Sequence, residues 1–282
     1  MTIKKKYSSL PFVILFILHS LLLLYAFYKK SKEDRRNMFL LLLSNIGIAY
    51  IFEYPILNVY RAYRYKPKIL KNNLLDNVLG AVISQGIIVP FTAVFLTAFN
   101  FGKKGKILFS MYYFFIERLF VKLGIYKQYW WKTIYTPILI YCYFGISNLW
   151  YNQIKKGNSN VLAITHFFCV NVVSINFLFV LAIMKKIKFG FGKVSSWHEH
   201  FLIVPVYSIL LSFLAVLSVK KGGFKPKIII FLIDLLIDLL LWKLNILKVK
   251  LNALFFFLLR HVLTIYCAVF FRKLVYMGKG RV

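Results

Sequence analysis

The chain has 282 residues, of which 60% are hydrophobic and 16% are charged, and its formal net charge at pH 7 is +30. Soluble domains are about 45–50% apolar, so this composition argues against a soluble domain and predicts a membrane protein. In a soluble protein, so large a positive charge would suggest nucleic acid as a partner. Here the Lys and Arg residues flank apolar runs, where they would meet anionic headgroups. We therefore expect a lipid bilayer with anionic lipids as partner, and no nucleic acid.

Nine apolar runs are long enough to cross a bilayer, since each span needs about 20 mostly apolar residues. The sequence therefore predicts an all-α, polytopic helical bundle with about nine transmembrane helices. In chain order, the predicted helices are 10–28, 38–57, 76–100, 107–126, 134–151, 160–184, 200–219, 228–244 and 253–271. No hydrophilic stretch between them is long enough to form a soluble domain.

The predicted loops divide the Lys and Arg residues equally between the two sides of the membrane, so the positive-inside rule leaves the orientation open. Lys4, Lys5 and Lys6 precede the first helix, which often dominates, and we expect the N-terminus in the cytoplasm. The first run continues to Tyr28 without a small-residue cleavage site, so we interpret it as a retained anchor and not as a signal peptide.

An internal similarity relates the two halves of the chain. Nine of the 24 positions from Lys104 to Lys127 are identical to their counterparts 121 residues later, and Glu117 falls on Asp238. At slightly different shifts, Pro90 matches Pro205 and Cys142 matches Cys267. A tandem duplication explains this pattern, and a biased composition is the competing explanation.

The duplication predicts three segments within one membrane domain. Residues 1–36 would be an N-terminal anchor helix and loop, 37–157 a first four-helix repeat and 158–282 a second four-helix repeat. Because four is an even number, both copies would enter the membrane from the same side, as parallel repeats. The sequence leaves a homo-oligomer open.

Acidic residues are rare, and most of them lie in the predicted helices. Six of the eight lie within these helices or at their ends, namely Glu53, Asp76, Glu117, Glu199, Asp234 and Asp238. A carboxylate at the centre of a membrane helix costs roughly 2.5–3.5 kcal/mol, so such residues seldom persist without a role.

Two of these acids have a candidate counter-ion. Asp234 and Asp238 are four residues apart and share a helix face. Arg260, with His261 beside it, lies in the next predicted helix. Together with Glu117, these four residues form the candidate ion- or substrate-binding site. The structural alternative is a clamp, in which the charges only fix how the helices pack.

Catalytic motifs are missing from the sequence. It contains no HExxH, GxSxG, P-loop or paired-cysteine motif, so we expect no catalytic residue and no cofactor. Trp197 to His200 has two histidines around Glu199 but no third ligand, so a hydrated segment at the interface is favoured over a metal site, and we expect no metal.

Several motifs between residues 37 and 152 resemble an uncharacterised family of small multi-pass membrane proteins from low-GC, spore-forming bacteria. They are a Lys-Pro-Lys-Ile-Leu loop (Lys66 to Leu70), a Val-Pro pair ending at Pro90, the central Glu117, and a Leu-Gly-Ile-Tyr run (Leu123 to Tyr126) followed by tryptophans. The resemblance implies a bacterial cytoplasmic membrane and assigns no function. The chain departs from that family by being about twice as long as its members.

Three functional hypotheses follow from these observations. A transporter-like protein would use the intramembrane carboxylates to handle an ion or small solute. A non-catalytic scaffold or sensor would use the same charges for helix packing. A lipid-modifying enzyme is the third hypothesis, for which no catalytic constellation can be named.

Overall fold

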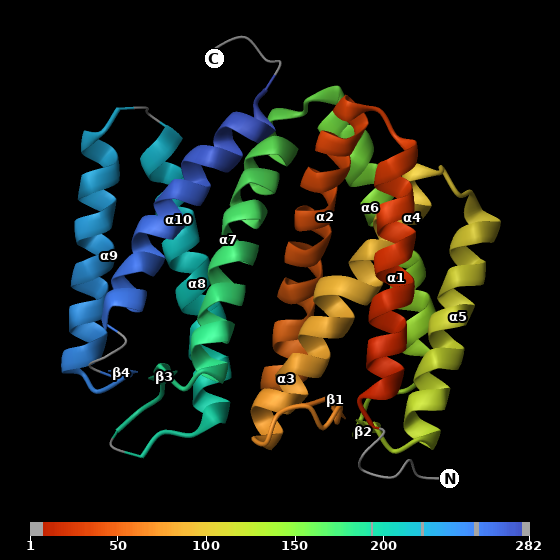
Figure 1. The fold of residues 1–282 in the computed structure, drawn as a ribbon, viewed down its shortest axis with the longest axis horizontal. Coiled ribbons are helices and arrows are strands. Elements are labelled where there is room, and N and C mark those ends of the chain that lie inside the picture. Colours follow the sequence, from red (N-terminus) through yellow and green to blue (C-terminus); the bar gives the residue numbers. More distant parts are fainter. Residues whose placement is uncertain (1–7, 193, 221–222, 251–253, 278–282) are drawn as a thin grey trace. The chain divides into compact units, whose positions relative to one another are not determined.

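The structure is a computed structural model that describes residues 8–192, 194–220, 223–250 and 254–277, apart from the side chains of residues 256 and 257. Within these ranges the chain forms nine continuous helical segments and two short antiparallel sheets (Figure 1). It divides into two compact units, Met1–Val161 and Leu162–Val282. This division falls within a few residues of the predicted boundary between the two copies.

Unit 1 begins with a helix that packs inside the unit. Its elements are α1 (Leu10–Lys29), α2 (Lys32–Glu53) continued by the π-helical η2 (Tyr54–Val59), β1 (Tyr63–Tyr65), α3 (Asn73–Ile83) continued by the π-helical η3 (Ser84–Ile88) and by α4 (Val89–Ala98), α5 (Lys103–Lys122), β2 (Tyr126–Gln128) and α6 (Tyr135–Lys156). Helix α1 packs against α4. The predicted anchor therefore belongs to the same compact unit as the predicted first repeat.

Unit 2 contains four helices and one sheet. Its elements are α7 (Ser159–Ile183), β3 (Ile187–Phe189), α8 (Trp197–Lys220), α9 (Lys225–Lys243), β4 (Leu247–Val249) and α10 (Leu254–Val275). Helix α8 packs against both α9 and α10, and β3 packs against α8. The unit is thus built around α8.

Each unit contains a small antiparallel sheet that the sequence did not predict. In unit 1, Tyr63 pairs with Gln128 and Tyr65 with Tyr126. In unit 2, the same strand positions pair in the same register, with Ile187 opposite Val249. Both units therefore have the order helix, strand, helix, helix, strand, helix, if α1 is left aside.

The turns before the strands also correspond. Arg61 precedes β1 by two residues and Lys185 precedes β3 by two residues, and both have a left-handed backbone, with φ of 49° and 56°. Gly124 and Asn245 precede β2 and β4 in the same way, with φ of 72° and 56°. Glycine and asparagine are residues that tolerate this conformation.

All nine predicted helices coincide with helical segments, but their ends differ. The described part of the last predicted helix starts at Leu254, because residue 253 lies outside the described residues. The predicted helix 107–126 is wrong at its C-terminal end, since α5 stops at Lys122 and Tyr126 already belongs to β2. The left-handed turn at Gly124 ends the helix.

Five of these helical segments are long and apolar enough to cross a membrane. They are Leu10–Lys29, Lys32–Val59, Asn73–Ala98, Ser159–Ile183 and Trp197–Lys220.

Helix α9 has the opposite of the pattern expected for a helix in water. Its buried residues are Asp234 and Asp238, whereas Ile229, Leu232 and Leu236 are exposed. In water, an amphipathic helix buries its apolar face and exposes its charges. Helix α9 does the reverse, which is the arrangement expected when apolar lipid replaces water as the surroundings.

A close approach between α3 and β1 leads to a stability prediction. A Cβ atom added to Gly80 would lie 2.4 Å from Cβ of Tyr65, whereas one added to Gly145 in α6 would have no neighbour within 4 Å. We expect Gly80→Ala to lower the free energy of unfolding by roughly 1–3 kcal/mol through overpacking. Denaturation of the purified protein in detergent measures this change. Gly145→Ala is the matched control, and equal stability of the two variants would contradict the prediction.

Candidate functional site

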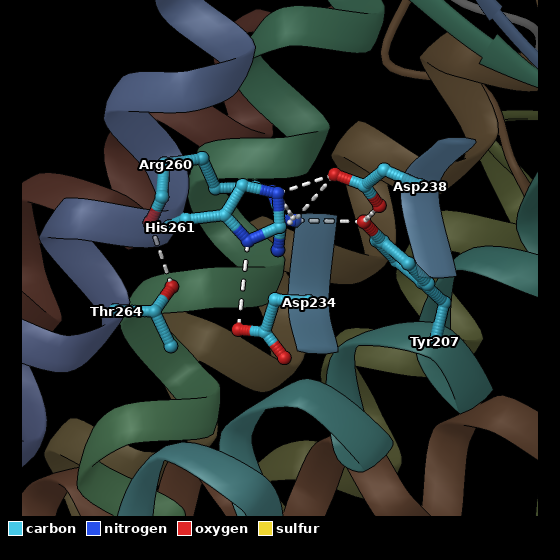
Figure 2. Close-up of polar contacts among 6 residues, drawn as sticks. All are labelled: Tyr207, Asp234, Asp238, Arg260, His261 and Thr264. Carbon is cyan, nitrogen blue, oxygen red and sulfur yellow. Dashed lines mark hydrogen bonds and ion pairs between the residues drawn. The ribbon is translucent and has the colours of Figure 1, made fainter. Parts of the chain in front are cut away.

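A cluster of ionisable side chains lies between α8, α9 and α10 of unit 2. Tyr207 comes from α8, Asp234 and Asp238 come from α9, and Arg260 and His261 come from α10 (Figure 2). The two aspartates meet the other groups because residues four apart share a helix face. Arg260, His261 and Asp234 have 0% exposure and Asp238 has 6%, so the cluster is closed off within the unit.

Asp238 is the centre of the cluster. Its Oδ1 accepts a hydrogen bond from the Tyr207 hydroxyl, and its Oδ2 contacts Nε2 of His261. The Arg260 guanidinium lies 3.6 Å from the same Oδ2 and also donates to the Tyr207 hydroxyl oxygen at 2.7 Å. One carboxylate thus joins all three helices.

His261 lies between the two carboxylates, as Figure 2 shows. Its Nε2 contacts Asp238, and its Nδ1 is 3.5 Å from Oδ2 of Asp234. When both ring nitrogens carry protons, each can face one carboxylate. A neutral ring has only one N–H and can donate to only one of them.

The charge of the cluster depends on His261. With both carboxylates ionised, they and the guanidinium leave a net charge of −1 beside a neutral His261 ring, and zero beside a protonated one. A net charge is costly in a buried site, so the neutral-ring state favours one additional positive charge, which is either a cation or a proton on a carboxylate. The arrangement can therefore hold a proton or an equivalent positive charge.

The sequence brought four of these residues together as candidates but did not identify Tyr207. Its signal in the sequence was weak. Tyr207 follows Pro205 by two residues just as Thr92 follows Pro90 in the matching segment, but the two residue types differ. Only the structure shows that both hydroxyl groups reach the helix that carries the acid, Thr92 through a 2.8 Å hydrogen bond with Tyr113 and Tyr207 through Asp238.

Glu117 belongs to unit 1 and has different surroundings. Its Oε1 accepts a 2.6 Å hydrogen bond from Nε2 of Gln128, and its Oε2 accepts one from the Thr136 hydroxyl. Among the described residues, no Lys, Arg or His forms a salt bridge with it. At the shifts found in the sequence, Thr136 corresponds to His261. The acid therefore contacts the same position of the following helix in both units.

Three of the other acids form hydrogen bonds with residues nearby in the chain. Both oxygens of Asp76 accept backbone N–H groups of the preceding loop, from Lys68 at 2.8 Å and from Ile69 at 2.8 Å. Glu199 accepts the N–H of Ser196 at 2.6 Å, and Ser196 Oγ accepts the N–H of Glu199, which is a capping box at the start of α8. Glu53 accepts a 2.6 Å hydrogen bond from the Tyr63 hydroxyl.

The predicted hydrated character of the segment from Trp197 to His200 is wrong for His200. This residue is fully buried, and its Nδ1 lies 3.0 Å from the backbone nitrogen of Phe189, whose N–H it accepts. The segment packs against β3, which the sequence did not predict. In the described part of the chain, no group of three or more His, Cys, Asp or Glu side chains could hold a metal ion.

Among the residues that the structure describes, the fold and the cluster define a mainly helical protein with five helical segments long and apolar enough to cross a membrane, and with ionisable side chains buried between three helices of one unit. Comparisons with protein-family models, with curated proteins and with solved structures find no match. The family resemblance of residues 37–152 therefore stays a prediction.

Proposed function

We propose that the chain is a multi-pass integral membrane protein that handles an ion or small solute, and that the cluster around Asp238 exchanges a proton for a cation. The observation that supports this function best is the position of His261 between two buried carboxylates. When the ring takes up a proton from the surrounding solution, the cluster becomes neutral. Loss of that proton leaves one negative charge, which a cation entering the site would balance.

We also propose that the chain crosses the membrane nine times. Five segments have the length and composition of spans, and the sheets support two more. Strands β1 and β2 pair, so the chain must return to the same end of unit 1 after leaving β1. If the segment Asn73–Ala98 crosses the membrane, α5 must cross back, and the same reasoning applies to α8 and α9 between β3 and β4. We include α6 and α10 for their lengths of 22 residues.

The two units are proposed to be parallel tandem copies, with α1 as an extra helix. The shared element order, the equal strand register and the matching left-handed turns support this proposal. A biased composition would explain a few identical residues, but it would not explain why strands of three residues pair in the same register twice.

Anionic headgroups at the sheet surfaces are the proposed lipid partner. In β1 and β2, Arg64 lies opposite Lys127, and in β3 and β4, Lys188 lies opposite Lys248. Directly opposed like charges destabilise a sheet. Anionic lipids of a bacterial cytoplasmic membrane, our proposed location, would offset this repulsion.

The number of spans can be tested by labelling single cysteines. After replacement of the three native cysteines by serine, we make Lys71→Cys, Lys104→Cys, Lys132→Cys and Lys156→Cys, all at exposed positions. In intact cells, an impermeant maleimide is expected to separate residues 71 and 132 from residues 104 and 156. Labelling of 104 and 132 from the same side would contradict a crossing by α5.

Transport is tested with purified protein in liposomes that contain a pH-sensitive dye. We impose a gradient of Na⁺, K⁺ or tetramethylammonium and record the internal pH. We expect a protein-dependent pH change with at least one of these cations, in the direction of exchange. No change above empty liposomes with any of them would contradict proton–cation exchange.

A scaffold or sensor is the second candidate function, and the closed character of the cluster favours it. In that case the charges only fix the packing of α8, α9 and α10, and neutralising Asp238 would unfold the unit without a separate effect on transport. The two candidates thus differ in whether folding and activity can be separated.

A further inference from the structure

Unit 1 contains a cavity of about 240 Å³. Residues of α1, α2, η3, α5 and α6, and of both strands, line it. An apolar cavity of about 150 Å³ accommodates benzene, so this one has room for an aromatic ring with a substituent. The π-helical η3 supplies Ser84 and Gln85 to the wall, and such irregular helical turns are common at functional sites.

The lining of the cavity is aromatic and contains one ionisable carboxyl group. The aromatic members are Phe12, Phe52, Tyr63, Tyr65, Tyr113, Phe120, Tyr126, Trp131 and Tyr143. Glu117 is the one acidic residue among the lining residues, and none of them is Lys, Arg or His. In a chain with a net charge of +30, a wall without cationic side chains favours a positively charged ligand.

The small sheet explains this separation of aromatic and basic groups. Tyr63 and Tyr65 are two residues apart and lie on one face of β1, and Tyr126 is opposite Tyr65. This face lines the cavity, whereas the intervening cross-strand pair of Arg64 and Lys127 belongs to the other face. The sheet therefore presents aromatic rings to the cavity and its cations away from it.

The aromatic rings form a compact group. The ring centroids of Tyr65 and Tyr126 are 5.0 Å apart, those of Tyr63 and Tyr126 are 5.1 Å apart, and those of Tyr63 and Trp131 are 5.2 Å apart. Burial raises the pKa of Tyr63, Tyr65 and Tyr126 well above the ordinary value, so the phenols stay neutral. Neutral aromatic rings attract cations through their electron-rich faces.

The carboxyl group of Glu117 completes this site. Its hydrogen-bond donors, Gln128 and Thr136, are uncharged, and no salt bridge with a cationic side chain is present among the described residues. Both donors are neutral, so these hydrogen bonds orient the carboxyl group without supplying a counter-charge. A cationic ligand would supply the counter-charge.

We propose that this cavity binds a hydrophobic organic monocation, namely a quaternary or protonated amine that carries an aromatic or short apolar body. The apolar wall would hold the body, and Glu117 with the tyrosine and tryptophan rings would hold the charge. Binding at this site does not depend on the proposed exchange at Asp238, because all of its residues belong to unit 1.

Equilibrium dialysis of labelled phenyltrimethylammonium against the full chain in lipid nanodiscs tests the proposal, with empty nanodiscs as the blank. We expect saturable binding at one site. The neutral analogue of the same shape, tert-butylbenzene, should compete at least about tenfold more weakly, because it lacks the cation–π and carboxylate attraction. Equal competition would overturn the proposal in favour of a lipid chain or another neutral occupant, as would the absence of saturable binding.

Variants locate the site. Glu117→Gln should weaken binding about tenfold, because it removes the charge and keeps a hydrogen-bond acceptor. Glu33→Gln, the same change at an exposed position, should leave binding unchanged. Wild-type affinity in Glu117→Gln would overturn the proposal. If that variant does not fold, the competition with the neutral analogue still decides. Asp238→Asn should bind as the wild type does, so failure of transport and failure of this site are distinguishable.

Discussion

Arg260→Met is expected to lower the free energy of unfolding by about 3–5 kcal/mol, because it leaves buried carboxylates without their guanidinium partner. Arg260 has 0% exposure and contacts both Asp238 and the Tyr207 hydroxyl. Methionine keeps a long apolar side chain, so the change removes mainly the charge and its hydrogen bonds. Denaturation in detergent, followed by circular dichroism, measures the effect.

Two further variants make this result specific. Arg118→Met changes an exposed arginine near the C-terminal end of α5, where a long basic side chain can reach the headgroups, and should lower the free energy of unfolding much less than Arg260→Met does. Adding Asp238→Asn to Arg260→Met removes the carboxylate that the guanidinium contacts, and should recover much of the lost stability. Equal stability of Arg260→Met and Arg118→Met would show that the buried charges are not coupled as described.

Asp238→Asn is expected to reduce proton–cation exchange in liposomes by at least about 100-fold, the scale on which positioned proton-transfer groups act. Asparagine has nearly the same shape and can still accept from the Tyr207 hydroxyl through its carbonyl oxygen. It cannot carry the negative charge that His261 and Arg260 face. The liposome assay measures the exchange, and circular dichroism checks the fold.

Glu33→Gln is the matched control, since Glu33 is exposed and the chemical change from carboxyl to amide is the same. The control should retain wild-type exchange. A folded Asp238→Asn protein with wild-type exchange would exclude Asp238 from transport. Loss of folded protein in that variant would instead favour the packing function of the scaffold hypothesis.

The helices could be predicted because each is a long apolar run, but their ends could not. Helix α2 begins at Lys32, six residues before the predicted start, because Ser31 caps it and its first turn is charged. The small sheets also escaped prediction. A strand of three residues, such as Tyr126 to Gln128, is too short to show the alternation by which strands are recognised.

The site was predictable for its charged residues, which share one helix or lie in the helix that follows it. Asp234 and Asp238 follow from their spacing of four, and Arg260 with His261 from their position in the next helix. The surroundings of Glu117 were not predictable, because Gln128 reaches it from a strand. The cavity depends on how five helical segments and a sheet surround a space, and no local pattern in the sequence records that.

If the buried cluster exchanges a proton for a cation, a group in it changes its charge while the protein stays folded. Nitrogen-15 spectroscopy of histidine-labelled protein in liposomes tests it most directly, with the His261 signals assigned by their loss in His261→Gln. When the concentration of the exchanged cation is raised at constant pH, we predict that these signals change from a doubly protonated to a neutral ring. Circular dichroism should stay constant. His261 signals that keep one form at every cation concentration in the folded protein would contradict proton–cation exchange at this cluster.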